Sequence, residues 1–270
     1  MDESGQAPVD PGLYTEEYFL ENVGGAEFYK LYGTRVVKPV QAYALRKAGL
    51  KPGMRALDIG CGRGEMLAQL LQRQVEAVGL DIALPALKLA GRTQGALVLR
   101  GDAKKLPFQD RSFDRIFFLG VLDHLHDWEL EDCFAEFGRV LRPGGLVLAN
   151  TCTNTQYYKR LTFTARQRLA AALGLKAPTP QRSSHDEKVH VNEHSQAALE
   201  RFFARIGWSG EIEARPNDKL LVRELYGEPL PPDFPLKPAP AWKARLFRLG
   251  FQGPWKRLLA REFFCTVGRA

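Results

Sequence analysis

Three glycines, Gly60, Gly62 and Gly64, occupy every second position of the segment ALDIGCGRG (56–64), between a predicted strand and a predicted helix. Because glycine lacks a Cβ atom, this spacing allows a tight turn and a close approach of a ligand to the backbone. The first N–H groups of the following helix have no intrahelical partners and favour a polar or anionic ligand. Tight strand-to-helix turns also form without ligands, so the glycines alone leave a purely structural turn open.

Two carboxylates follow at the ends of the next two predicted strands. Asp81 comes 21 residues after Gly60, where a side chain can accept hydrogen bonds from both hydroxyls of a ribose. Asp102 ends the third strand in GDAKKLPF, where it can approach an adenine amino group. Either acid alone could cap a helix or lie in a solvated turn. The glycine loop, Asp81 and Asp102 follow three successive strands and so lie on one edge of the sheet. This arrangement instead indicates a nucleotide-like ligand.

The elements that must position these residues alternate along the chain. Short, nearly continuous apolar runs predict strands at 54–60, 76–82, 96–102, 113–120, 145–150, 208–215 and 262–269. Helices are predicted at 65–74, 84–92, 128–141 and 195–207. Strand–helix alternation with apolar strands is typical of an α/β fold with a doubly wound parallel sheet covered on both faces.

Five segments in order, DIGCGRG, GLDI, GDAKKLPF, SFDRI and LRPGG, resemble the class I S-adenosylmethionine-dependent methyltransferases over about residues 50–150. The resemblance implies a seven-stranded Rossmann-like sheet whose last strand, EFFCTVGR, runs antiparallel. One departure is that about 45 residues separate the last two strands, where the family has a short hairpin. A nicotinamide-dependent dehydrogenase is the alternative on this fold, but it favours G-x-G-x-x-G over the G-x-G-x-G present here.

The resemblance also implies the residues that would contact S-adenosyl-L-methionine. The loop would lie against the methionine part and the ribose, Asp81 would hold the ribose hydroxyls, Ile82 would pack on the adenine, and Asp102 would bind the adenine amino group. The expected cofactor-binding residues are Asp58, Gly60, Cys61, Gly62, Asp81, Ile82, Asp102, Ala103, Leu119 and Gly120.

A hydroxyl acceptor would need a base to remove its proton, and histidine is the usual general base. His124, four residues after Gly120, is the first candidate, and His190 is the second. His126 is a weaker candidate, and His124 packing beneath the site is the structural alternative. His190 and His194 have the spacing of a metal-ligand pair on a helix, but no further ligands are defined, so no metal is expected.

These observations predict methylation of a hydroxyl of a small molecule or glycan, with N- or C-methylation of a small metabolite as the alternative. Methyltransferases that act on the amino groups of nucleic-acid bases resemble one another in a [DN]-P-P-[FY] motif after the fourth strand. This chain has Leu119-Gly120-Val121-Leu122 there, so nucleic-acid methylation is disfavoured. A cofactor-binding partner protein without activity is the remaining alternative. The sequence predicts neither the acceptor nor the oligomeric state.

The chain divides into a mobile tail at 1–12, an N-terminal helical cap at 13–52 and a methyltransferase domain at 53–270. We expect insertions at about 151–194, as a lid over the acceptor, and at 226–261, which is Pro-rich and basic. The run YFLENVGGAEFYKLYGTR resembles methyltransferases of bacterial surface-polysaccharide and natural-product gene sets. From this cap Tyr14, Tyr18 and Arg35 could reach the cofactor carboxylate, although the tyrosines could equally pack in the core.

The formal net charge of +7 invites a nucleic-acid or membrane interpretation, but the surplus of basic residues lies in 235–270. There Trp242, Leu246 and Leu249 share one helical face, with bases beside it. This composition suits a helix on an anionic membrane, and the alternative is a helical pair packed on the domain. Dispersed cysteines, no apolar leader and no apolar run of ~20 residues favour a cytoplasmic protein, peripheral at most to the inner membrane face.

Overall fold

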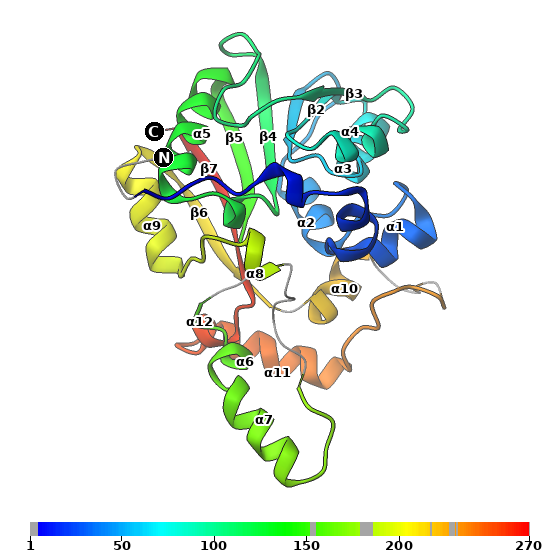
Figure 1. The fold of residues 1–270 in the computed structure, drawn as a ribbon, viewed down its shortest axis with the longest axis vertical. Helices are drawn as coiled ribbons and strands as arrows, with labels where there is room; N and C mark the ends of the chain where they lie inside the picture. The colour runs from blue at the N-terminus through cyan, green and yellow to red at the C-terminus, as the bar shows by residue number, and fades with distance from the viewer. Residues whose placement is uncertain are drawn as a thin grey trace.

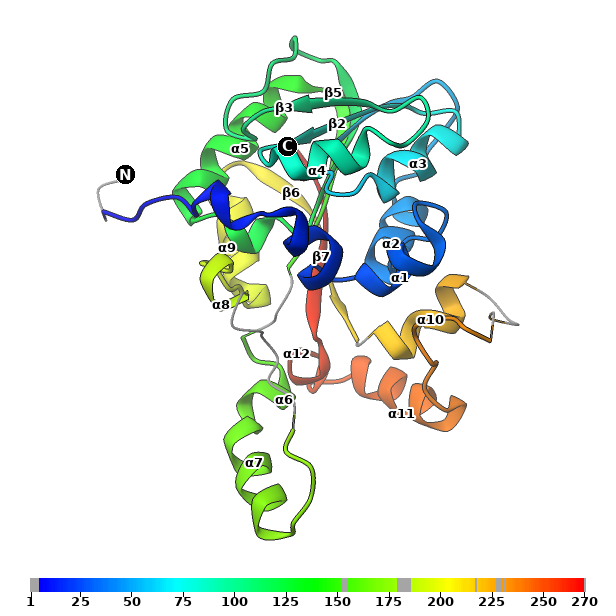
Figure 2. The same cartoon turned by 45° about the vertical axis from the view of Figure 1, so that its right-hand side comes forward.

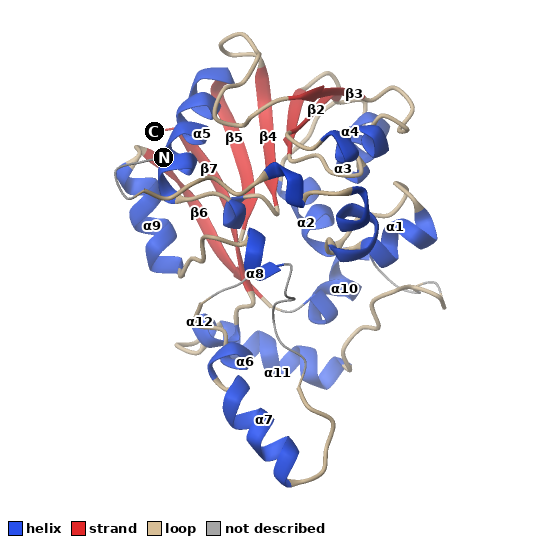
Figure 3. Ribbon diagram, in the orientation of Figure 1, coloured by secondary structure: helices blue, strands red, loops and turns tan. Residues whose placement is uncertain are grey.

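The computed structural model describes residues 5–151, 155–178, 186–216, 218–226, 230 and 232–269. Within these residues one mixed sheet has the strand order β3-β2-β1-β4-β5-β7-β6 (Figures 1 and 3). Its strands are β1 (Arg55–Ile59), β2 (Glu76–Asp81), β3 (Leu97–Arg100), β4 (Phe113–Leu119), β5 (Leu141–Asn150), β6 (Trp208–Arg215) and β7 (Glu262–Arg269). Because β7 pairs antiparallel with both β5 and β6, the predicted seven-stranded sheet with an antiparallel last strand is confirmed.

The helices alternate with the strands and extend the chain at both ends. The N-terminal part holds η1 (Pro11–Leu13), η2 (Tyr18–Asn22), α1 (Ala26–Tyr32) and α2 (Pro39–Lys47). The sheet region holds α3 (Glu65–Gln72), α4 (Leu84–Ala90), η3 (Leu122–His124), α5 (Asp127–Val140) and α9 (Gln196–Arg205). The insertions hold α6 (Tyr158–Leu161), α7 (Phe163–Ala172), α8 (Asp186–Val189), α10 (Asp218–Tyr226), α11 (Ala241–Phe251) and α12 (Lys256–Leu259).

The two faces of the sheet bury different sets of side chains, as the two-residue period of a strand requires. In β4, Ile116 and Phe118 pack toward α5 and α9, whereas Phe117 and Leu119 pack toward α2 and α3. The other central strands divide in the same way, so most residues of β1, β2, β4, β5 and β7 are buried. This explains why the strands read as continuous apolar runs.

The parallel strands and the antiparallel β7 determine where the added segments lie. Asn150, the last residue of β5, pairs with Phe264 near the start of β7, and Arg215 at the end of β6 pairs with Glu262. Both insertions therefore leave the sheet at its carboxyl edge. Figures 1 and 2 show α6, α7, α11 and α12 beyond that edge, away from the sheet. None of the helices within the described ranges is long and apolar enough to cross a membrane.

The segment expected as a helical cap at 13–52 holds three short helical elements. Its first element is a single π-helical turn, η2, and the next two, α1 and α2, are separated by residues 33–38. Gly33 ends α1 in a positive-φ conformation, and Pro39 opens α2 at a position where a missing N–H costs nothing. The division into tail, cap and insertions remains a prediction.

Candidate functional site

The glycine loop joins β1 to α3 and turns tightly against the segment that follows β4. Gly60 has φ +70°, and a Cβ atom built on it would lie 2.3 Å from Cγ2 of Val121. The backbone of Gly60 instead approaches Val121 and donates a hydrogen bond to the carbonyl oxygen of Leu80 at 2.8 Å. Glycine is therefore required here by both the backbone angle and the space, so the predicted tight turn is present and the close neighbour of Gly60 is Val121. The close approach of a ligand remains a prediction.

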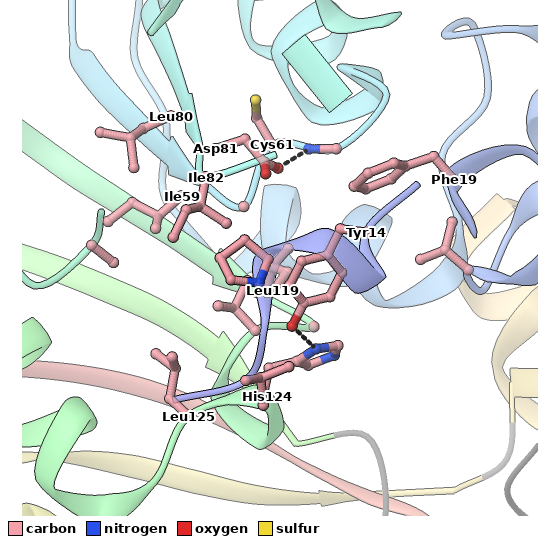
Figure 4. Close-up of a pocket in the computed structure, with 18 of the residues that line it drawn as sticks. Tyr14, Phe19, Ile59, Cys61, Leu80, Asp81, Ile82, Leu119, His124 and Leu125 are labelled. Carbon is pink, nitrogen blue, oxygen red and sulfur yellow. Dashed lines mark hydrogen bonds between the residues drawn. The ribbon is translucent and has the colours of Figure 1, made fainter. Parts of the chain in front are cut away.

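Asp81 connects the loop to the end of β2. One carboxylate oxygen accepts the N–H of Gly62 at 3.0 Å, and the other accepts the N–H of Ala83 at 2.9 Å (Figure 4). Burial raises the pKa of Asp81, while these backbone N–H groups act in the opposite direction. The carboxylate is thus held in one orientation at the loop, where its oxygens can serve a ligand hydroxyl.

Asp102 and Ala103 follow β3, at the same carboxyl edge of the sheet as Asp81. Asp102 accepts the backbone N–H of Lys104 at 2.9 Å, and the ammonium of Lys104 lies 3.4 Å from its other oxygen. Lys104 also forms a 2.6 Å ion pair with the fully buried Glu129. The side chain of Asp102 stays 43% exposed, so it remains accessible to a ligand.

A cavity of about 330 Å³ lies between these elements and the N-terminal segment. Nine of the ten expected cofactor-binding residues line it. They are Gly60, Cys61, Gly62, Asp81, Ile82, Asp102, Ala103, Leu119 and Gly120. Figure 4 shows Ile82, Ile59 and Leu119 on one side of the hollow, with Phe19 and Tyr14 opposite. Polar groups at strand ends and apolar side chains between them suit a ligand with both a ribose and a flat ring.

Asp58 is the expected residue that does not line the cavity. It lies beneath the loop, 4% exposed, and one of its carboxylate oxygens has no hydrogen-bond partner among the described residues. Burial, with the nearby carboxylates of Glu65 and Asp81, raises the pKa of Asp58 to about 8, and Lys38 acts in the opposite direction. Asp58 is therefore mainly protonated at neutral pH.

The N-terminal segment forms the roof of the cavity. Pro8, Val9 and Pro11 line it together with Tyr14 and Tyr18. The tail predicted at 1–12 thus has described residues at the site, because its apolar side chains cover the opening. Tyr18 and Phe19 pack against Ala86 and Leu89 of α4, which fixes this segment over the end of β2.

The two candidate bases lie side by side. The hydroxyl of Tyr14 lies 2.8 Å from Nδ1 of His124, which lines the cavity next to Gly120 (Figure 4). The ring of His190 meets the ring of His124 edge to face, with centroids 4.8 Å apart. Burial, reinforced by the charges of Asp81 and Glu129, raises the pKa of Tyr14 well above its usual value. Tyr14 therefore stays protonated.

His190 and His194 do not face one another as a ligand pair. His190 contacts His124, whereas Nε2 of His194 lies 3.5 Å from Asp127. His194 lowers the pKa of Asp127 to about 2, and Asn192 also contributes a hydrogen bond to that carboxylate. No cluster of three or more potential metal ligands exists among the residues that the structure describes.

The segment expected to form a lid does not supply cavity wall in its described parts. Residues 155–178 and 186–194 include none of the lining residues, and α7 projects away from the sheet in Figures 1 and 2. His190 reaches the site only through its contact with His124. The lid therefore remains a prediction.

Sequence reasoning missed Lys38, a cation in the lining of the cavity. Arg35 does not line the cavity, because its guanidinium turns back to the carbonyl of Tyr32 at the end of α1. Lys38 lines the cavity instead, and its Nζ lies 4.0 Å from the position of a Cβ built on Gly120. No signal in the sequence marks Lys38, since only the packing of the cap determines which base points inward.

Two other polar residues hold the site and were missed. The buried guanidinium of Arg63 donates to Glu65 at 2.8 Å and to the carbonyl of Phe19 at 2.8 Å, which ties the N-terminal segment to the glycine loop. Asn150 at the end of β5 accepts the N–H of Gly120 at 3.0 Å. Both could have been found, because each is a polar residue at the same carboxyl edge as Asp81.

Comparison with known proteins agrees with this geometry. A family model described as a methyltransferase domain matches residues 57–149. The chain is 32% identical over 176 residues to a demethylmenaquinone methyltransferase of Mycobacterium sp. (strain KMS), covering 60% of this chain and 70% of the relative. The chain belongs to the class I S-adenosylmethionine-dependent methyltransferase family, which defines both its fold and the type of cofactor site.

Other relatives are matched over a smaller share of their own length. An uncharacterized protein of Methanocaldococcus jannaschii is 36% identical over 137 residues, 47% of this chain and 51% of the relative. The chain spans about half the length or less of several of its curated relatives. The Haemonchus contortus phosphoethanolamine N-methyltransferase 2, solved with S-adenosyl-L-methionine, superposes with a TM-score of 0.59 at 18% identity, over 95% of this chain and 60% of that one. That likeness concerns the fold alone.

Proposed function

We propose that the protein transfers a methyl group from S-adenosyl-L-methionine to a hydroxyl of a small molecule or glycan. The observation that supports this proposal is the Tyr14–His124 pair at the cavity wall, where His124 would act as the base. The cofactor, when bound, supplies an electrophilic methyl group on a sulfonium.

The residues of the cavity fit that cofactor. Asp81 would accept hydrogen bonds from the ribose hydroxyls, and Asp102 would accept one from the adenine amino group, with the Ala103 amide nearby. Lys38 would pair with the cofactor carboxylate, because it is a cation on the same cavity wall as Gly120. The buried Asp58 would accept a hydrogen bond from the amino group of the methionine part, through the carboxyl oxygen that has no partner among the described residues.

His124 would remove the proton from the acceptor hydroxyl. Since Tyr14 stays protonated, the proton must go to the imidazole and not to the phenol. With Nδ1–H donating to the oxygen of Tyr14, Nε2 is the atom that would accept the proton. The edge-to-face contact with His190 would hold the ring in that orientation.

A second candidate is N- or C-methylation of a small metabolite. It is favoured by the mycobacterial relative, which is a demethylmenaquinone methyltransferase, and by the apolar side chains that line the cavity, which include Val9, Val121 and Leu125. A carbon nucleophile on an activated ring, or a neutral amine, would also benefit from a base at His124.

An acceptor screen distinguishes these candidates. The purified protein is incubated with S-adenosyl-L-methionine and panels of sugars, phenols, quinols and amines, and release of S-adenosylhomocysteine is measured. Mass spectrometry and NMR then locate the new methyl group. A methyl on oxygen supports the proposal, and a methyl on carbon or nitrogen overturns it in favour of the second candidate. Cofactor binding without turnover on any panel would indicate a binding protein without activity.

A further inference from the structure

Exposed apolar side chains concentrate at one end of the molecule, which we call the basic pole and define as residues 155–178 and 241–261. Eight of the twelve exposed large hydrophobic residues among the described parts of the chain belong to it. They are Leu161, Leu169, Leu173, Leu175, Trp242, Leu246, Leu249 and Trp255. Two tryptophans at 69% and 63% exposure are uncommon on a surface that meets only water.

The helix α11 has two apolar faces, and the structure decides which one packs. Ala244, Phe247 and Phe251 are half-buried, and Phe251 packs against the main core. Trp242, Leu246 and Leu249 are exposed on the opposite side of the helix. The inward face of α11 is therefore occupied by Ala244, Phe247 and Phe251, and the stripe of Trp242, Leu246 and Leu249 faces away from the core. The alternative of a helical pair packed on the domain stays open, because α11 packs through its other face.

The basic pole carries positive charge without any acidic residue. Residues 155–178 and 241–261 contain no Asp or Glu. Their bases are Lys159, Arg160, Arg166, Arg168, Lys176, Lys243, Arg245, Arg248, Lys256, Arg257 and Arg261. Among the described residues of neighbouring segments, Glu193 pairs with Arg160 and Glu224 lies 3.9 Å from Arg248.

The two parts of the pole lie close together although they are far apart in sequence. Burial lowers the pKa of Lys159, and the like charges of Arg166, Lys243, Arg261 and Lys219 lower it further. Figures 1 and 2 both show α6 next to α12 and α11, beyond the carboxyl edge of the sheet. The positive charges and the exposed apolar side chains therefore gather at one end of the molecule, beyond the carboxyl edge of the sheet.

We propose that the basic pole docks on an anionic lipid surface. Leucine and tryptophan side chains would enter the boundary between headgroups and acyl chains, while the flanking lysines and arginines would meet the lipid phosphates. A second copy of this chain is the weaker occupant, because a two-fold interface would bring two acid-free basic surfaces together. A nucleic acid would neutralise the bases but leave the leucines of α7 and α11 in water.

Vesicle cosedimentation tests the proposal with the full chain. The protein is mixed with vesicles of phosphatidylcholine alone or with about 30 mol% phosphatidylglycerol, whose negative surface attracts basic segments. Binding is measured in about 0.1 M and about 1 M salt, because the Debye length falls from about 10 Å to about 3 Å between them. We expect binding to the anionic vesicles in low salt and weaker binding in high salt.

Two variants and two matched controls separate the contributions. Trp242→Ser/Leu246→Ser/Leu249→Ser removes the exposed stripe, and Leu31→Ser/Leu84→Ser/Leu97→Ser removes three exposed leucines elsewhere. Arg166→Glu/Lys243→Glu/Arg245→Glu reverses charge at the pole, and Lys51→Glu/Lys88→Glu/Arg92→Glu reverses the same amount elsewhere. We expect each pole variant to lower the vesicle partition coefficient at least about tenfold and each control to change it less than about twofold.

Thermal unfolding and binding of S-adenosyl-L-methionine check that every variant is folded. Equal partitioning of a folded pole variant and its control would overturn the proposal, as would the absence of wild-type binding to anionic vesicles. A dimer in light scattering that the serine variant dissociates, without vesicle binding, would assign the surface to a second copy. Tight binding of a short RNA or DNA, without vesicle binding, would assign it to nucleic acid.

Discussion

The hydroxyl of Tyr14 lies 2.8 Å from Nδ1 of His124, across 110 residues of sequence. The tyrosine comes from the N-terminal segment that roofs the cavity, and the histidine comes from the turn after β4. This pair links the position of the N-terminal segment over the cavity to the orientation of the candidate base.

Replacing His124 with alanine should remove the base without removing the cofactor site. We expect turnover to fall by about 10²- to 10⁴-fold, the usual contribution of a general base, with the Kd for S-adenosyl-L-methionine changed less than about threefold. Tyr14→Phe should lower turnover by about tenfold, because it removes one hydrogen bond. The measurements are calorimetry and S-adenosylhomocysteine release with the acceptor from the screen. His126→Ala, on the same turn but outside the cavity wall, is the control, and normal turnover in His124→Ala would remove His124 as the base.

Replacing Asp81 with alanine should weaken cofactor binding by at least about a hundredfold. The change removes the carboxylate that holds the N–H groups of Gly62 and Ala83 and would accept the ribose hydroxyls, and hydrogen bonds to charged groups contribute about 1.5–3 kcal/mol each. Calorimetric titration with S-adenosylhomocysteine measures the effect. Asp132→Ala on the exposed side of α5 should bind normally. Unchanged affinity in Asp81→Ala would contradict the site assignment.

Gly60→Ala should destabilise the protein through two separable effects. The left-handed backbone costs about 1–2 kcal/mol for a residue with Cβ, and the new methyl group would overlap Val121. Gly95→Ala is the matched control, because Gly95 has φ +79° but no atom within 4 Å of its built Cβ. We expect Gly60→Ala to lower the free energy of unfolding more than Gly95→Ala, and the double variant Gly60→Ala/Val121→Ala to show a favourable coupling. Additive effects in urea unfolding would show that the contact with Val121 does not limit this position.

Asp58→Asn should change how stability depends on pH. The pKa of Asp58 is about 8 in the folded protein, so the folded state keeps a proton that the unfolded chain releases near its ordinary pKa of about 4. Its contribution to stability is therefore complete below about pH 4 and is lost as the pH rises to about 8. Asparagine carries no such proton. As the pH rises between these limits, the free energy of unfolding of Asp58→Asn should therefore increase relative to that of the wild type, by up to about 1.4 kcal/mol per pH unit. Urea unfolding at pH 5, 6.5 and 8 measures the gap, and a constant gap would show that Asp58 is ionised throughout.

The strands and the sites at their ends could be predicted from the sequence because their signals are local. Each strand overlaps its predicted range, since apolar runs bounded by Gly, Pro and Asp specify both length and burial. β5 is the exception in length, because it begins at Leu141, four residues before the predicted start, and includes Pro143 and Gly144. Parallel strands place their carboxyl ends at one edge, so Asp81 and Asp102 had to lie close to the glycine loop. The class of fold and most of the cavity wall follow from these two facts.

Contacts between segments that are far apart in the sequence could not be predicted from such local signals. No spacing rule connects Tyr14 to His124 or selects Lys38 over Arg35 as the base that points inward, because these choices depend on how the N-terminal cap packs on α4 and the glycine loop. Asp58 shares its strand with cavity residues, but the alternation of side chains directs it to the face covered by α2 and α3.

The sequence by itself determined that the chain forms a methyltransferase sheet with nucleotide-type acids at its carboxyl edge, and that its surplus positive charge lies near the C-terminus. Only the tertiary structure decided that α11 packs through Ala244, Phe247 and Phe251 and presents Trp242, Leu246 and Leu249 outward. The physical reason is that both faces of this helix are apolar. Periodicity shows that such a helix has two candidate contact faces, and the competition between them is settled by which one fits the core.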